Sequence, residues 1–113
     1  MPKVHVHGAS GIKYQFSVNP LNTKFEALGA VYIVTKRTKE SEGAATHKFL
    51  YVGETGDLST RFDGHHKQGC FDHEGANCIG IHLDDSEESR KTKEADLYRS
   101  RRWPCNDYTA AHN

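Results

Sequence analysis

Residues 49–62 constrain the fold most, because the spacing of apolar side chains changes within this short stretch. Residues 49–53 alternate as in a half-buried strand. Residues 55–57, Thr-Gly-Asp, supply turn chemistry and a candidate helix N-cap. Leu58 and Phe62 then share one face of a helix. The sequence therefore predicts a strand that runs almost directly into a helix.

This predicted helix carries two polar side chains that can act together. Arg61 and His65 are four residues apart, so a guanidinium and an imidazole project from the same side, one turn apart. Both lie near the end of the preceding strand. The pair is a candidate site for an anionic oxygen.

Size and charge exclude several classes of protein. The chain has 113 residues, enough for one domain, and its 15 Lys plus Arg balance 15 Asp plus Glu. A neutral chain lacks the footprint of a constitutive nucleic-acid binder, so any nucleic-acid contact must be local or weak at physiological salt. No apolar run approaches membrane-spanning length, and the first residues lack an apolar signal core. We therefore expect a cytoplasmic protein without a membrane partner; the oligomeric state is left open.

The remaining elements predict an α+β domain with a small antiparallel sheet. Residues 4–7 and 12–18 flank a glycine turn and predict an N-terminal β-hairpin that extends the sheet. Residues 30–35 are almost wholly apolar, which favours a central strand covered on both faces. Further strands are expected at residues 47–53 and 77–83.

A final helix is predicted from an N-cap at Asp85, with Glu88 completing a capping box, to about Arg101. Glu94 lies on the same face of this helix as Leu97 and Tyr98, which is the face expected to pack. A carboxylate there is costly unless it is paired or bound to something.

Histidine and cysteine residues raise the question of a metal site. His5 and His7 alternate with valines, so they fall on the outer face of a strand, and a solvated face is favoured over metal binding. Three cysteines without an export signal predict free thiols. A structural zinc site is disfavoured, because the chain has no Cys-x-x-Cys pair and a strand position for Cys78 suits burial. Its ligands would be Cys70, His73 and Cys78, with His66 or His82.

Taken together, these residues resemble the GIY-YIG nucleases. Ala30-Val31-Tyr32 and Tyr51-Val52-Gly53 stand where the two motifs would be, with Arg61 ten residues after the second tyrosine and His65 four further on. Glu94 matches the family's metal-ligand glutamate and Asn106 its terminal asparagine, twelve residues later, with Pro104 ahead of it. Ala30 replaces the first glycine of the motif, and the interval between the two tyrosines is longer than the commonest form.

The resemblance covers about two thirds of the chain and implies three segments. Residues 29–106 would form the GIY-YIG-like domain, residues 1–28 an N-terminal hairpin extension with its connection, and residues 107–113 a tail.

The resemblance also implies a function, that of a metal-dependent endonuclease that hydrolyses phosphodiester bonds in nucleic acid, DNA more than RNA. Glu94 would hold Mg²⁺ or Mn²⁺, and Arg61 would clamp the phosphate. Tyr32 resembles the general base, acting as a phenolate or through His65. Tyr51 would orient the water or a phosphate oxygen, and Asn106 would fix neighbouring groups by hydrogen bonds. Lys36, Arg37 and His66 are further candidate substrate contacts.

Other interpretations remain open from the residues alone. Tyr32 and Tyr51 can be ordinary sheet aromatics, and Arg61 and Glu94 a structural ion pair. Lys36 and Arg37 open a polar connection, residues 36–46, that a solvated loop also explains. The alternative function is a module that binds nucleic acid or a protein without turnover, and an active enzyme can need a protein partner for targeting.

Overall fold

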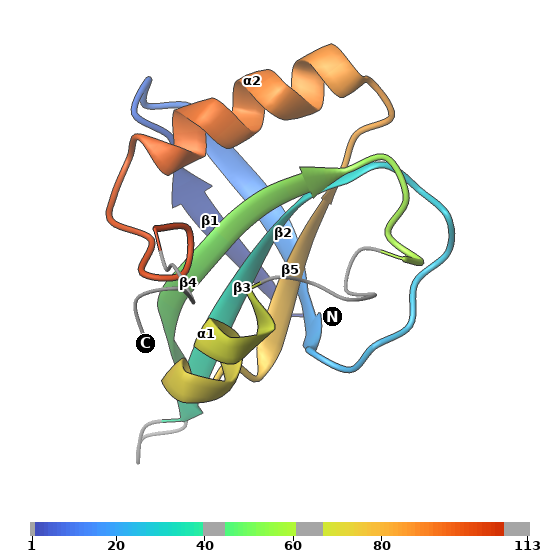
Figure 1. Cartoon of the computed structure of the whole chain (residues 1–113). Helices are drawn as coiled ribbons and strands as arrows, with labels where there is room; N and C mark the ends of the chain where they lie inside the picture. The colour runs from blue at the N-terminus through green and yellow to red at the C-terminus, as the bar shows by residue number, and fades with distance from the viewer. Residues whose placement is uncertain (1, 40–44, 61–66, 108–113) are drawn as a thin grey trace.

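The computed structural model describes residues 2–39, 45–60 and 67–107, and within them the chain forms one five-stranded antiparallel sheet with two helices (Figure 1). The strand order is β1-β2-β5-β3-β4. The α+β class, the antiparallel sheet and the N-terminal hairpin at its edge are confirmed. The elements are β1 Lys3–His7, β2 Lys13–Pro20, β3 Ala30–Lys39, β4 Ala45–Thr55, α1 Gln68–Glu74, β5 Cys78–Leu83 and α2 Glu87–Tyr98.

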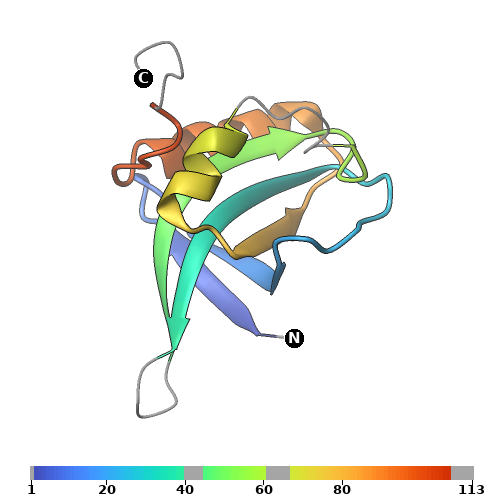
Figure 2. The same cartoon turned by 60° about the horizontal axis from the view of Figure 1, so that its bottom comes forward.

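The two helices cover opposite faces of the sheet, as the turned view in Figure 2 shows. Phe71 of α1 belongs to a buried cluster with Tyr32 and Val34, which we call the α1-side core. Leu97 of α2 belongs to a second cluster with Val31, the α2-side core. The central strand β3 therefore contributes alternate residues to both cores, which explains its almost continuous apolar sequence.

A β-bulge in β4 decides which side chains face which core. Val34 pairs with Tyr51 and the next residue, Thr35, with Phe49, so Leu50 is skipped. The extra residue resets the alternation. Tyr51 consequently packs against the α1-side core, whereas Val52 lies in the α2-side core.

The N-terminal hairpin is fastened to α2 through one buried carboxylate. Val6, Tyr14 and Phe16 of the hairpin are part of the α2-side core. Asp96 accepts hydrogen bonds from the backbone N of Ser10 at 2.8 Å and from the Tyr14 hydroxyl at 2.7 Å. Burial and this contact with Asp96 raise the pKa of Tyr14 to about 12.

The role of this contact can be tested by replacing Tyr14 with phenylalanine. Tyr14 is 7% exposed, and losing its hydrogen bond to Asp96 should lower the free energy of unfolding by about 1 kcal/mol. Tyr98→Phe is the matched control, because Tyr98 also donates to an aspartate, Asp107, but is 44% exposed. It should change little. Chemical denaturation of both variants measures the difference, and equal stabilities would contradict the fastening role.

Details of the strands differ modestly from expectation. His5 and His7 are exposed, as predicted. Ile12 is 56% exposed and precedes β2, which starts at Lys13. Lys36 and Arg37 belong to β3 instead of a loop, because β3 continues to Lys39.

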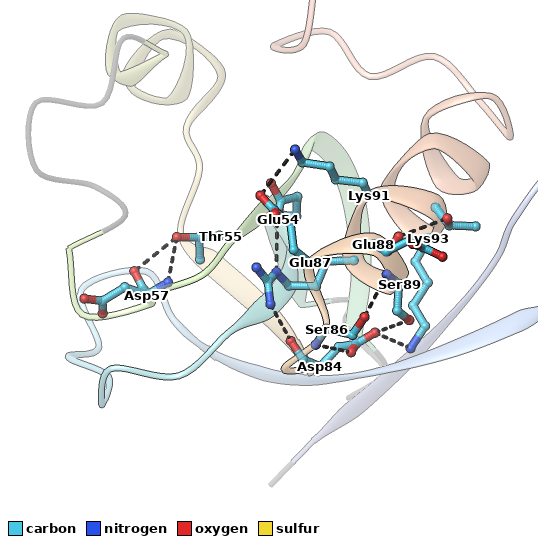
Figure 3. A network of polar contacts seen from close by, with 12 residues as sticks. Glu54, Thr55, Asp57, Asp84, Ser86, Glu87, Glu88, Ser89, Lys91 and Lys93 are labelled. Atoms are coloured by element: carbon cyan, nitrogen blue, oxygen red, sulfur yellow. Dashed lines mark hydrogen bonds and ion pairs between the residues drawn. The ribbon is translucent and has the colours of Figure 1, made fainter.

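The start of α2 differs from the predicted cap. Ser86, not Asp85, is the N-cap, and its side chain accepts from the backbone N of Ser89 at 3.2 Å. Asp84 accepts from the Ser86 backbone N and the Ser89 hydroxyl and pairs with Lys93, as Figure 3 shows. Because Asp84 organises this turn, the helix begins one residue later than the predicted cap allowed.

The end of α2 also differs. The helix ends at Tyr98, three residues before the predicted end at Arg101. The indole N–H of Trp103 donates to the carbonyl of Leu97 at 3.0 Å, and this turn directs the chain back into the α2-side core.

The segment between β4 and β5 was predicted least well. Asp57 does accept from the backbone N of Ser59, at 2.9 Å, as a capping residue would. Residues 58–60 form a turn, and the predicted helix beyond it falls on residues 61–66, which lie outside the described residues. Two of the candidate zinc ligands, Cys70 and His73, lie in a helix that was not predicted, α1, which starts at Gln68.

The prediction that all three cysteines are free thiols was wrong. Cys70 of α1 and Cys105 form a disulfide, with their Cα atoms 5.7 Å apart, and only Cys78 is free and buried. The zinc site weighed above is thereby excluded in its full form, since Cys70 has no free thiolate to offer.

Candidate active site

Two tyrosine rings lie over Gly53 at the middle of the β3–β4 ladder. Tyr32 pairs directly with Gly53, and Tyr51 is two residues before it on the same face of β4. The ring centroids of the tyrosines are 6.0 Å apart. A Cβ atom at Gly53 would lie 2.9 Å from the Tyr32 hydroxyl oxygen and 2.8 Å from the Tyr51 ring. Only glycine allows both rings to occupy this position.

The two tyrosines differ in their access to solvent. Tyr32 is 4% exposed, whereas Tyr51 is partly exposed and packs its ring edge-on against Phe71 of α1. Burial raises the pKa of Tyr51, the Glu94 carboxylate raises it further, and a hydrogen bond with Tyr32 acts in the opposite direction. At neutral pH the Tyr51 side chain is therefore a neutral hydroxyl that can donate a hydrogen bond.

Glu94 is a partly buried carboxylate that has no hydrogen-bond donor among the described residues. Burial raises its pKa, the neighbouring carboxylate of Glu54 adds to this rise, and the Lys91 ammonium opposes it. Among the described residues, no side chain or backbone N–H forms a hydrogen bond or ion pair with the Glu94 carboxylate. A partly buried carboxylate in this state is costly, so Glu94 is the group here that most needs an external cation or donor.

Three carboxylates near the first turns of α2 are paired with cations. Glu54 pairs with Arg90 at 2.9 Å and Asp84 with Lys93 at 2.9 Å. Glu87 pairs with Lys91 at 3.3 Å, on the exposed side of the helix. Figure 3 shows these carboxylates grouped around the first turns of α2. Glu54, the carboxylate that acts on Glu94, is thus paired with Arg90, whereas Glu94 has no such partner among the described residues.

Asn106 holds the outer edge of β4 beside the tyrosines. Its amide accepts from the backbone N of Val52 at 2.9 Å and donates to the Val52 carbonyl at 2.9 Å. The backbone N of Cys105 donates to the Leu50 carbonyl at 2.8 Å. Tyr51 therefore lies between two residues whose backbones are held by the same segment. Asn106 is placed to position Tyr51, and its amide is already used by the backbone.

The remaining candidate residues divide into two groups. Lys36 is on the same strand face as Tyr32 but four residues away, about 13 Å along β3, and Arg37 bonds through its backbone to Asn77. The structure does not bring either of them beside the tyrosines. Arg61, His65 and His66 lie outside the described residues.

No family model, curated protein or solved structure matches this chain. Within residues 2–39, 45–60 and 67–107, no group of three or more His, Cys, Asp or Glu residues is arranged to hold a metal ion. The described helices include none that is long and apolar enough to cross a membrane.

The donor set nevertheless fits a hard divalent cation with few protein ligands. Mg²⁺ and Mn²⁺ prefer oxygen ligands, and Mg²⁺ usually keeps several waters around one or two carboxylates. Glu94 offers such a carboxylate, with no competing donor in the part of the chain that the structure describes, and its charge acts on Tyr51.

Sequence reasoning missed Arg90 and its partner Glu54. The available signal was spacing: Arg90 is four residues before Glu94, which places both on one side of a helix. Glu54 directly follows the Tyr51-Val52-Gly53 motif, on the opposite strand face from Gly53.

Proposed function

We propose that this protein is a metal-dependent endonuclease of the GIY-YIG type that hydrolyses phosphodiester bonds in nucleic acid, DNA in preference to RNA. The observation that carries the proposal is the partly buried carboxylate of Glu94, which has no partner among the described residues and is close enough to raise the pKa of Tyr51. Phosphodiester hydrolysis needs neutralised phosphoryl oxygens and an oriented water. A carboxylate that can take a divalent cation, next to a hydroxyl that can donate, supplies both requirements.

The side chains have distinct roles in this proposal. Glu94 holds Mg²⁺ or Mn²⁺, which supplies charge neutralisation at the phosphate when bound. Tyr51 acts as a neutral hydroxyl that orients the attacking water or a phosphate oxygen, in keeping with its raised pKa. Tyr32 would act as the general base, either as a phenolate that takes the proton of the water or through His65, and Arg61 would clamp the phosphate. Lys36 and Arg37 would contact the substrate farther from the reacting bond, and His66 is a further candidate contact.

The deep burial of Tyr32 favours one alternative function. A base that is only 4% exposed must be reached through its hydrogen bond with Tyr51, and the neutral net charge gives no general attraction to nucleic acid. The alternative is a module that kept this fold to bind nucleic acid or a protein without turnover.

A substrate panel separates the two functions. The purified protein is incubated with single-stranded, duplex, flap and branched DNA and RNA, with Mg²⁺, with Mn²⁺ or with a chelator. We expect cleavage of at least one DNA substrate in the presence of either cation and none with chelator, because the phosphate charge is then not neutralised. Binding without cleavage on every substrate would establish the non-catalytic module instead.

A further inference from the structure

Arg90 is a buried arginine one turn before Glu94 on α2. It is 6% exposed, its Nε donates to Oε1 of Glu54 at 2.9 Å, and its Nη1 donates to the backbone carbonyl of Asp84 at 3.1 Å. Glu54 is near the end of β4, and Asp84 directly follows β5. Arg90 thus joins α2 to the ends of two strands.

Two glycines fit closely around the same guanidinium. A Cβ atom at Gly29, just before β3, would lie 2.6 Å from Nη1 of Arg90, and one at Gly56 would lie 3.4 Å from Nη2. The guanidinium therefore fills the space that a side chain at Gly29 would occupy, and at Gly56 it lies at van der Waals distance. Its position is fixed on several sides by backbone, which distinguishes it from a surface arginine.

The fixed guanidinium of Arg90 pairs with one of the two carboxylates near it and not with the other. Arg90 and Glu94 are neighbours on one helix face, since they are four residues apart, and Glu54 meets that face from β4. Arg90 binds Glu54 and leaves Glu94 without a partner among the described residues. Of these two carboxylates, one is therefore paired with Arg90, and the other has no partner within the described residues.

We propose that the Arg90–Glu54 ion pair sets the charge around Glu94, and thereby the affinity of Glu94 for a divalent cation. Arg90 is a positioning residue in this proposal. Its ion pair with Glu54 keeps that carboxylate from binding the cation, and its contacts hold α2 over the strand ends. The proposal rests on the proposed function, because it takes Glu94 as the metal-holding residue.

The proposal predicts opposite effects for the two partners of the ion pair. Glu54→Gln leaves the positive charge of Arg90 uncompensated near Glu94, so Mn²⁺ should bind at least about threefold more weakly. Arg90→Gln leaves a second unpaired carboxylate, so Mn²⁺ should bind at least about threefold more tightly. The double variant is neutral again and should return close to the wild-type affinity.

The experiment measures Mn²⁺ binding without reference to activity. Free Mn²⁺ is quantified by electron paramagnetic resonance in titrations of the full chain and its variants, and thermal unfolding monitors the fold. Arg90→Lys keeps the charge, so its affinity should stay near wild type even if its stability falls; it serves where Arg90→Gln fails to fold. Glu74→Gln, in the pair with Lys48 on the other face of the sheet, is the control for a remote charge change and should have little effect.

Opposite shifts in the single variants, cancelled in the double variant, would support the proposal. Shifts of equal sign, or a loss of stability with unchanged Mn²⁺ affinity, would show that the ion pair is merely structural. Absence of Mn²⁺ binding in the wild type would also overturn the proposal. Failure of this proposal can be distinguished from failure of the proposed nuclease function. The shifts in Mn²⁺ affinity can occur in a protein that cleaves no nucleic acid. Cleavage can also occur in a protein whose Mn²⁺ affinity does not depend on the Arg90–Glu54 ion pair.

Discussion

Replacing Glu94 with glutamine is expected to lower metal-dependent cleavage by about a thousandfold or more while leaving the protein folded. Glutamine keeps nearly the same shape but cannot neutralise a divalent cation. Stability should stay level or rise, because burial already disfavours the charged form of Glu94 and no described donor compensates it. Cleavage rate, nucleic-acid affinity and melting temperature are measured on the same preparation.

The control for this change is Glu88→Gln, at an exposed position in the first turn of the same helix. It should cleave like the wild type. If Glu94 is a structural residue, Glu94→Gln will cleave at close to the wild-type rate and melt at a lower temperature. That combination would end the assignment of Glu94 as the metal-holding residue.

Removing the disulfide is expected to have the largest effect on stability. Cys70 and Cys105 are 35 residues apart, and closing a loop of this length stabilises the folded chain by about 4 kcal/mol in the chain-entropy account. Replacing both cysteines by alanine should lower the free energy of unfolding by that order. Chemical denaturation with and without a dithiol reductant measures the loss.

Reductant supplies the internal control for this prediction. It should lower the stability of the wild type and of Cys78→Ala, in which the bridge remains, and leave the doubly substituted protein unchanged. A wild type with the same denaturation midpoint in both conditions would show that the bridge does not contribute.

The strands could be predicted because their signals are local. Residues 30–35 are apolar on both faces, and residues 13–20 alternate, so the central strand and the hairpin follow from period and composition. Helix α1 lacks such a signal: it is short, has no side-chain N-cap hydrogen bond, and buries only Cys70 and Phe71. Its formation depends on tertiary contacts, which a single sequence does not display.

The candidate site was predictable in part for the same reason. Motif spacing pointed to Tyr32, Tyr51 and Glu94, and in the structure Tyr51 lies near both of the others. The pairing of Arg90 with Glu54 depends on how α2 crosses the sheet, and the disulfide depends on where the C-terminal segment returns. The ion pair and the disulfide each join residues more than thirty positions apart, so no periodic pattern in the sequence indicates them.

The C-terminal segment that contains Cys105 and Asn106, and that holds β4, also limits how this protein can associate with copies of itself. Its contacts with Leu50 and Val52 occupy backbone groups that an incoming strand would need. At the opposite edge, β1 has only five residues, Lys3–His7. Growth of a fibre by edge-to-edge addition requires two available edges on every molecule. Because the middle of the β4 edge is occupied, two molecules can join through their β1 strands but no third molecule can add to the β4 edge. The C-terminal segment thereby prevents open-ended assembly.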